Sequence, residues 1–334
     1  PAPTPLLAVR RLRVQYRIPG RWPWSRAGTL RAVEELNFNL HAGQTLGVVG
    51  ESGCGKSTLA RTLIGLQSAH SGSIKYQGRD ITHLDKAGWQ PLRREIQMVF
   101  QDPLASLDPR MSIGRIIAEP LESLCPEMDR DARNARVIET MHGVGLSPEL
   151  VNRYPHEFSG GQCQRVGIAR ALAVGAELII ADEPVSALDV SIQAQILNLF
   201  SKLQQERKLA ILFISHDLGV VRYLCRRVAV MYLGRIIEQG SSEAVFVAPL
   251  HPYTQSLAAA IPKMAADATV PGAPLGGEPP SPQNIPAGCP FHPRCPKAMD
   301  VCRTGAPPPA YEVEGRRVWC HLYASDLVQS DRAR

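Results

Sequence analysis

The segment Gly50–Ser57, which reads GESGCGKS, constrains the fold of this chain more than any other. A short apolar run, Leu46–Val49, comes before it, and the run Thr58–Ile64 behind it has helical spacing. A strand, a glycine-rich loop and a helix in that order direct backbone N–H groups and a helix N-terminus at the phosphates of a nucleotide. The pattern therefore predicts an α/β fold that contains a phosphate loop and binds a nucleoside triphosphate.

The residue types within this loop match what phosphate binding needs. Glycines permit a tight curl and a close approach of the backbone to the ligand. Lys56 places a point charge on the β- and γ-phosphates, and the hydroxyl of Ser57 is suited to ligate Mg²⁺. The predicted nucleotide-binding residues of the loop are Gly50, Ser52, Gly53, Cys54, Gly55, Lys56, Ser57 and Thr58.

The composition limits what surrounds the loop. The chain has 334 residues, enough for one large domain with an appendage or for two domains, and 44% of them are hydrophobic, as in globular proteins. No run approaches about 18 apolar residues and the start lacks the plan of a signal peptide, so we expect a cytosolic protein. The net charge of +6 comes from scattered Lys and Arg without a basic–aromatic stripe, so we expect no nucleic-acid partner.

A second motif lies at Glu177–Pro184, an apolar run that ends in Asp182 and Glu183. Open α/β sheets bind their ligands at the carboxyl ends of the strands. We therefore expect Asp182 to hold Mg²⁺, directly or through water, and Glu183 to polarise the attacking water. Between the two motifs, the turn Ser159–Gln162 opens an apolar-striped helix and predicts a second backbone cradle for an anion.

Together with further segments in the same order, these motifs resemble the ATP-binding cassette (ABC) ATPases. Phe158–Arg165 resembles the signature motif of that family, with Phe158 in place of the ideal Leu and Cys163 where a basic residue is frequent. The resemblance spans about residues 6–262. It implies a phosphate-loop α/β core, an antiparallel β subdomain and a helical subdomain at about residues 102–170.

The resemblance also implies roles for single residues. Gln101 would lie in the Q-loop, sense Mg²⁺ and signal to the transport partner, and His216 would contact the γ-phosphate from the H-loop. Tyr16 would stack on adenine, and Asp189 would cross a dimer interface in the D-loop. The family sandwiches two nucleotides between two cassettes, so the signature of one cassette caps the nucleotide of the other. The implied signature residues are Ser159, Gly160, Gly161 and Gln162.

Other segments are more specific than these core motifs: Gln101–Arg110, Tyr154–Phe158, Asp182–Val190, Met231–Arg235 and His251–Thr254. They resemble the ATP-binding subunits of dipeptide and oligopeptide importers, closest to the second dipeptide subunit. The resemblance implies an ATPase at the cytoplasmic face of the inner membrane that powers peptide import. Its partners would be a second, non-identical ATPase subunit, two membrane permeases and, indirectly, an extracytoplasmic peptide-binding protein.

Two alternative functions stay open. Importers of nickel, haem or antimicrobial peptides reuse similar ATPases, and the chain could instead be a metal-sensing regulatory ATPase. ABC proteins of translation and DNA repair do not fit, because there is one cassette and no sustained heptad pattern between the phosphate loop and Asp182. The loop Pro19–Arg26, with Trp22 and Trp24, either touches the permease or the membrane face, or is an ordinary variable loop.

The composition shifts after the ATPase domain, which we place at residues 1–262. Residues 266–288 are rich in Pro, Gly and Ala and predict an irregular linker within a C-terminal extension of residues 263–334. Four cysteines follow closely enough in sequence for their thiolates to enclose a metal centre. Their spacing leaves zinc and iron–sulfur open, and the family resemblance implies a structural or regulatory [4Fe-4S] cluster. The implied ligands are Cys289, Cys295, Cys302 and Cys320.

Overall fold

The structure is a computed structural model that describes residues 4–18, 28–260 and 277–324. The Trp-bearing loop Pro19–Arg26 and the part of the expected linker up to residue 276 lie outside these residues. The described part of the linker, residues 277–288, contains bends and turns but neither helix nor strand.

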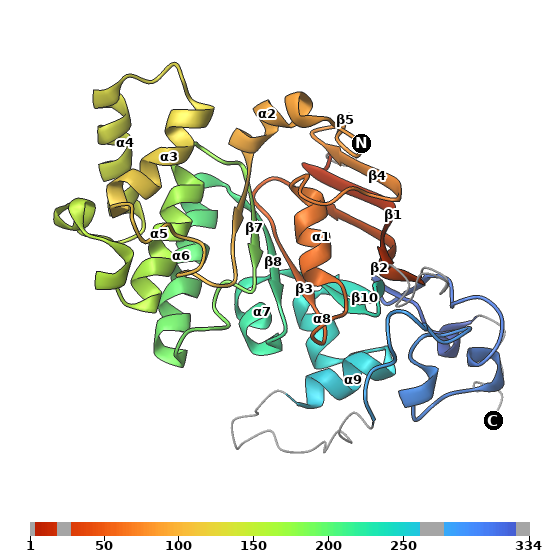
Figure 1. The fold of residues 1–334 in the computed structure, drawn as a ribbon. Coiled ribbons are helices and arrows are strands. Elements are labelled where there is room, and N and C mark those ends of the chain that lie inside the picture. Colours follow the sequence, from red (N-terminus) through yellow and green to blue (C-terminus); the bar gives the residue numbers. More distant parts are fainter. Residues whose placement is uncertain (1–3, 19–27, 261–276, 325–334) are drawn as a thin grey trace.

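A mixed sheet forms the centre of the molecule (Figure 1). Among the described residues it has eight strands in the order β11-β12-β10-β9-β3-β8-β7-β6. The strands from β9 to β6 pair in parallel, and their nearly continuous burial explains the apolar runs seen in the sequence. The strands of this parallel part are β3 (Thr45–Val49), β6 (Ile96–Val99), β7 (Leu178–Asp182), β8 (Ala210–Ser215) and β9 (Arg227–Tyr232).

An antiparallel sheet covers one face of this centre, in the order β2-β1-β4-β5. Helix α1 (Lys56–Leu63) lies between the two sheets, and one hydrophobic core cluster contains buried side chains from α1 and from both of them. Helix α1, which follows the phosphate loop, is thus packed between two layers of sheet. The antiparallel strands are β1 (Leu7–Ile18), β2 (Gly28–Leu40), β4 (Ser71–Tyr76) and β5 (Arg79–Asp80).

The opposite face of the central sheet carries helices that share a second core cluster. Along β7 the side chains alternate between the two clusters: Ile179 and Ala181 face the helices, whereas Leu178 and Ile180 face α1. The helices α3, α4 and α5 contact one another. The remaining bounds are α2 (Lys86–Glu95), α3 (Ile113–Leu124), α4 (Arg130–Gly143), α5 (Gly160–Ala173), α6 (Val190–Arg207), α7 (Leu218–Leu224), α8 (Ser242–Val247) and α9 (Pro252–Ala259), with short 3-10 turns at Pro148–Asn152 and Pro155–Glu157.

The C-terminal extension is built onto the sheet of the ATPase core. Its hairpin, β11 (Tyr311–Val313) and β12 (Arg316–Val318), pairs antiparallel with β10 (Arg235–Ser241) and so covers what would otherwise be an open edge. The extension also contributes Cys289, Phe291 and Cys302 to the core cluster on the helical face. It contains 3-10 turns at His292–Arg294, Asp300–Cys302 and His321–Tyr323.

Within residues 4–18, 28–260 and 277–324, no helix is both long enough and apolar enough to span a membrane.

Candidate active site

The phosphate loop joins β3 to α1, and its glycines are required by close backbone contacts. A Cβ at Gly50 would lie 2.1 Å from the carbonyl oxygen of Met231, and one at Gly55 would lie 2.0 Å from that of Ala32. Gly55 also has φ 105°, a left-handed conformation that disfavours residues with a side chain. The predicted loop therefore forms with the geometry that points the N-terminus of α1 at a ligand.

Lys56 is the first residue of α1, and 4% of it is exposed. Its Nζ donates hydrogen bonds to the carbonyl oxygens of Gly50 at 2.7 Å and Glu51 at 3.0 Å. The ammonium group thus lies inside the curl of the loop, where it is available to exchange these oxygens for phosphate oxygens.

Ser57 and Asp182 meet at the carboxyl edge of the sheet, with Ser57 Oγ donating to Asp182 Oδ1 at 3.2 Å. Burial raises the pKa of Asp182, and the Ser57 hydrogen bond opposes that shift. A hydroxyl and a buried carboxylate fit the oxygen ligands that Mg²⁺ prefers, and a bound cation would keep the carboxylate ionised.

Glu183 brings three predicted residues together. Its Oε2 lies 3.0 Å from His216 Nδ1 and accepts a hydrogen bond from Gln101 Nε2 at 3.2 Å, and its Oε1 lies 3.8 Å from Lys56 Nζ. Glu183 has φ 47°, the left-handed region that non-glycine residues rarely adopt. Its N–H donates to the carbonyl oxygen of Ile214 at 2.9 Å, which holds this conformation in place. Strained backbone of this kind is concentrated at functional sites.

Tyr16 lies beside the first turn of α1. Its hydroxyl donates to Thr58 Oγ1 at 3.4 Å, which places the ring of this β1 residue beside the first turn of the helix. The structure thus brings two predicted nucleotide-binding residues, Tyr16 and Thr58, together at the start of α1.

The signature residues are not brought to the phosphate loop of the same chain. Ser159 and Gln162 begin α5 and cap each other: Gln162 N–H donates to Ser159 Oγ at 3.3 Å, and Ser159 N–H donates to Gln162 Oε1 at 2.9 Å. Gly160 and Gly161 lie against Leu188 and Ile192 near the start of α6. Asp189, the N-cap of α6, is exposed, as is Ser159. Helices α5 and α6 pack on the helical face of the sheet, opposite α1 (Figure 1).

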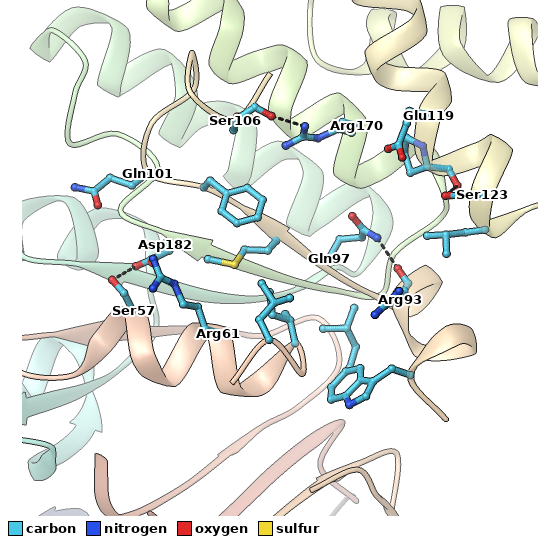
Figure 2. Close-up of a pocket in the computed structure, with 18 of the residues that line it drawn as sticks. Ser57, Arg61, Arg93, Gln97, Gln101, Ser106, Glu119, Ser123, Arg170 and Asp182 are labelled. Carbon is cyan, nitrogen blue, oxygen red and sulfur yellow. Dashed lines mark hydrogen bonds between the residues drawn. The ribbon is translucent and has the colours of Figure 1, made fainter. Parts of the chain in front are cut away.

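A cavity of about 770 Å³ extends from the Ser57–Asp182 pair towards α3. Figure 2 shows Gln101 at the same end of the cavity as that pair, with Glu119 and Ser123 of α3 at the far end. Arg170 of α5 lies between, donating to the carbonyl oxygen of Ser106, and burial lowers its pKa. The exposed ring of Phe100 also lines the cavity. The cavity therefore connects the predicted Mg²⁺ residues with the helical region.

The four cysteines of the extension are free thiols, of which Cys289, Cys302 and Cys320 are buried and Cys295 is half-buried. Burial raises the pKa of Cys289 to about 11 and that of Cys320 to about 12. Neighbouring thiols add to both shifts: Cys302 and Cys295 act on Cys289, and all three others act on Cys320. Nevertheless, within the described ranges no group of three or more His, Cys, Asp or Glu side chains is arranged to hold a metal ion. The expected [4Fe-4S] cluster therefore has no support from the side-chain arrangement of the described residues.

The contacts of Glu51, Tyr253 and Arg294 at the phosphate loop were not predicted from the sequence. Glu51, within the phosphate loop, pairs with Arg294 of the extension, and Glu51 N–H donates to Tyr253 Oη at 3.0 Å. In the sequence, His251–Thr254 stands out only as a family-specific motif, and Arg294 carries no signal beyond its place next to Cys295.

Comparisons with known proteins match two parts of the chain. A family model described as ABC transporter matches residues 33–186, and one described as the C-terminal region of oligopeptide/dipeptide transporters matches residues 237–302. A probable peptide ABC transporter ATP-binding protein, y4tS of Sinorhizobium fredii, is 52% identical over 96% of this chain and 90% of its own length.

Oligopeptide transport ATP-binding proteins are similar to the same extent. OppF of Escherichia coli is 51% identical over 90% of this chain and 92% of its own length, and AppF of Bacillus subtilis is 50% identical over 90% and 92%. Among solved structures, the ATP-binding cassette MJ0796 bound to ADP and Pi has a TM-score of 0.63 at 27% identity, over 71% of this chain and 98% of that one.

Proposed function

This chain belongs to the family of peptide ABC transporter ATP-binding proteins, and from that membership we propose that it hydrolyses ATP to power the import of di- or oligopeptides through a membrane permease. The observation that carries the proposal is the convergence of Gln101, His216 and Lys56 on Glu183, next to the Ser57–Asp182 pair. The match of the C-terminal region to the peptide-transporter model supports peptides over nickel or haem. The relatives carry peptide and oligopeptide names, so the narrower assignment to a second dipeptide subunit stays a prediction.

The residues at the site divide the work of phosphoryl transfer to water. Glu183 accepts a proton from the attacking water, and His216, 3.0 Å away, orients that carboxylate and faces the γ-phosphate. Lys56 exchanges the carbonyl oxygens of Gly50 and Glu51 for phosphate oxygens. Ser57, Asp182 and Gln101 would hold Mg²⁺, which when bound neutralises charge on the phosphates. Tyr16 stacks on the base.

We further propose that the site is completed in a dimer of two non-identical cassettes. The exposure of Ser159 and Asp189 supports a dimer, since a second cassette has access to both, and the family resemblance is the ground for a non-identical partner. The residues that line the cavity run from Gln101 to α3, and packed side chains along this lining would carry a change at the site to the region where we expect the permease to bind. The ATPase domain would comprise residues 1–262, with its helical subdomain at about 102–170, and would act at the cytoplasmic face of the inner membrane with two permeases and, indirectly, a peptide-binding protein.

The change Glu183→Gln tests the catalytic assignment in the complete transporter. It keeps the size of the side chain and removes the base, so we expect hydrolysis to fall by roughly 10²- to 10⁴-fold while ATP binding persists. Glu206→Gln, at an exposed position of α6, is the matched control and should hydrolyse ATP at the wild-type rate. Steady turnover by the Glu183 variant would refute the role of this residue.

Uptake by the assembled transporter tests the substrate. Cells that lack the chromosomal copy should regain uptake of a labelled peptide with the wild-type gene and not with the Glu183→Gln variant. Uptake of nickel or haem under the same control, without uptake of peptide, would contradict peptide import in favour of one of the alternatives.

We also propose that the extension, residues 263–334, holds a [4Fe-4S] cluster through Cys289, Cys295, Cys302 and Cys320. The raised pKa values of Cys289 and Cys320, to which the neighbouring thiols contribute, support this, because a bound metal centre would supply the positive charge that stabilises thiolate forms. The side chains would have to turn towards a common point. Protein purified without oxygen should contain about four irons and four acid-labile sulfides per chain. Cys295→Ser should lower both and Cys125→Ser neither, whereas zinc or no metal in the wild type would refute the cluster.

A further inference from the structure

An ion pair joins the C-terminal extension to the phosphate loop. Arg294 Nη1 lies 2.8 Å from Glu51 Oε2, and Arg294 Nη2 lies 3.0 Å from Glu51 Oε1. Two parallel bonds from a guanidinium to a carboxylate fix direction as well as distance. The Arg294 side chain is 5% exposed and that of Glu51 26% exposed, so solvent screens this pair less than a surface pair. The hydrogen bonds to Glu51 raise the pKa of Arg294, which stays charged.

The backbone of Glu51 is held as firmly as its side chain. Its N–H donates to Tyr253 Oη at 3.0 Å, and its carbonyl oxygen accepts from Lys56 Nζ at 3.0 Å. Three segments thus meet on one residue of the loop: α1 through Lys56, α9 through Tyr253 and the extension through Arg294. Because Lys56 is the cation of the phosphate loop, a displacement of Glu51 also displaces a partner of the lysine.

Arg294 is in turn fixed by a cluster of buried aromatic rings. Its guanidinium lies 6.0 Å from the centre of the Tyr232 ring, within the range of a cation–π contact. Phe291, in the same turn of the extension, packs edge to face on Tyr232 at 5.3 Å and on Tyr253 at 5.4 Å. The ring centres of Tyr232 and Tyr253 are 4.8 Å apart. The place of Arg294 therefore depends on how the extension packs against the ATPase core.

We propose that Arg294 is a positioning residue for nucleotide binding: through Glu51 it holds the first turn of the phosphate loop and makes the affinity for ATP depend on the folded extension. This inference rests on the ATP-binding role of the loop. Linkage requires the converse, so nucleotide on the loop also steadies the turn of the extension that carries Arg294.

Equilibrium titration of the full chain with a fluorescent ATP analogue is the first test. Arg294→Met removes the ion pair and should weaken binding roughly fivefold or more, and Arg294→Lys, which keeps the charge but not the paired geometry, should weaken it less. Arg303→Met is the matched control, because Arg303 is an exposed arginine of the same extension. It should bind the analogue as the wild type does.

Two further readouts separate positioning from a general loss of structure. The double variant Glu51→Gln/Arg294→Met should bind no more weakly than Arg294→Met, because both changes remove the same contact. Steady-state hydrolysis should show a raised KM with a smaller change in kcat. Hydrogen exchange at backbone amides of residues 289–302 should slow when ATP is added to the wild type and should not respond in Arg294→Met.

Unchanged affinity in both Arg294 variants and in Glu51→Gln, with wild-type thermal unfolding, would overturn the inference. So would additive effects of the two changes, or exchange in the extension that ignores nucleotide in the wild type. These results differ from a failure of the proposed function, in which the wild-type chain itself would not bind the analogue. If Arg294→Met does not fold, the Lys and Glu51→Gln variants decide by the same titration.

Discussion

The phosphate loop and the C-terminal extension both gather small sets of polar or reactive side chains, but the chain builds them differently. In the loop, the backbone itself makes the site: Gly50 and Gly55 allow the curl, and Lys56 and Ser57 follow at once in sequence. In the extension, the backbone is irregular around the cysteines, and packing on the ATPase core gives it its place. The difference teaches that the loop depends on local conformation, whereas the extension depends on long-range contacts.

The largest test of this comparison exchanges a glycine in each region for alanine. In Gly55→Ala the new Cβ would meet the carbonyl oxygen of Ala32 at 2.0 Å, so the loop must move and ATP binding should fall at least about a hundredfold, which corresponds to the loss of one or two hydrogen bonds to a charged phosphate. In Gly315→Ala, at the turn of the β11–β12 hairpin, the Cβ meets nothing within 4 Å. The alanine there would only have to adopt the left-handed φ of 72°, which should lower the free energy of unfolding by about 1–2 kcal/mol.

Titration with the ATP analogue and urea unfolding measure the two effects separately. Equal loss of nucleotide binding in both variants would contradict the local origin of the loop conformation. The loop would then depend on the hairpin as strongly as on its own backbone.

The contrast between local conformation and long-range contacts also explains which parts of the site could be predicted from the sequence. Glu183, Gln101 and His216 each follow a parallel strand, so their convergence could be expected from their places in the sequence. The pair Glu51–Arg294 could not, because its members are 243 positions apart and no strand order or helical period relates them. The antiparallel pairing of β12 with β10 was missed for the same reason.

The cysteines of the extension show a different limit of sequence reasoning. Four thiols close in sequence predict a metal centre, but the pattern does not determine where the sulfurs point, because irregular backbone has no period from which to infer it. The structure brings them near one another without forming a metal-binding group in the described residues. Proximity could therefore be predicted from the sequence, and coordination geometry could not.

A buried ion pair attaches the extension to the central sheet. Arg316 of β12 is 3% exposed, lies 3.7 Å from the fully buried Glu238 of β10, and donates to the carbonyl oxygens of Ala244 and Ala248. Arg316→Met leaves a buried carboxylate without this cation and should cost about 3–5 kcal/mol of unfolding free energy. The adjacent Arg317 pairs with Glu312 on the surface, so Arg317→Met should cost at most about 1 kcal/mol.

Urea unfolding of the two variants measures these costs, and the ATP titration shows whether loss of the hairpin reaches the loop. Equal stability of both variants would mean that the buried network does not attach the extension.

The smallest effect is a pH dependence at the junction of the two regions. Burial lowers the pKa of His251 to about 3, and its Nδ1 accepts a hydrogen bond from Tyr253 N–H, the residue whose hydroxyl reaches the loop. An unfolded histidine has a pKa of about 6.5, so between pH 6.5 and 3 the unfolded chain binds a proton that the folded chain does not. Stability should therefore fall as pH decreases through this window, by about 2 kcal/mol at pH 5 from this residue.

His251→Gln keeps an acceptor for Tyr253 N–H and removes the titration, so the difference between its unfolding free energy and that of the wild type isolates the histidine. Burial raises the pKa of Glu238, whose carboxylate accepts the N–H of His251, and this carboxyl acts in the opposite sense, because a folded state that holds a proton more tightly gains stability as pH falls. The wild type should lose stability relative to the variant only below about pH 6.5. A constant difference from pH 8 to pH 4 would show that His251 titrates in the folded state as it does in the unfolded chain, and that the junction between loop and extension is open to water.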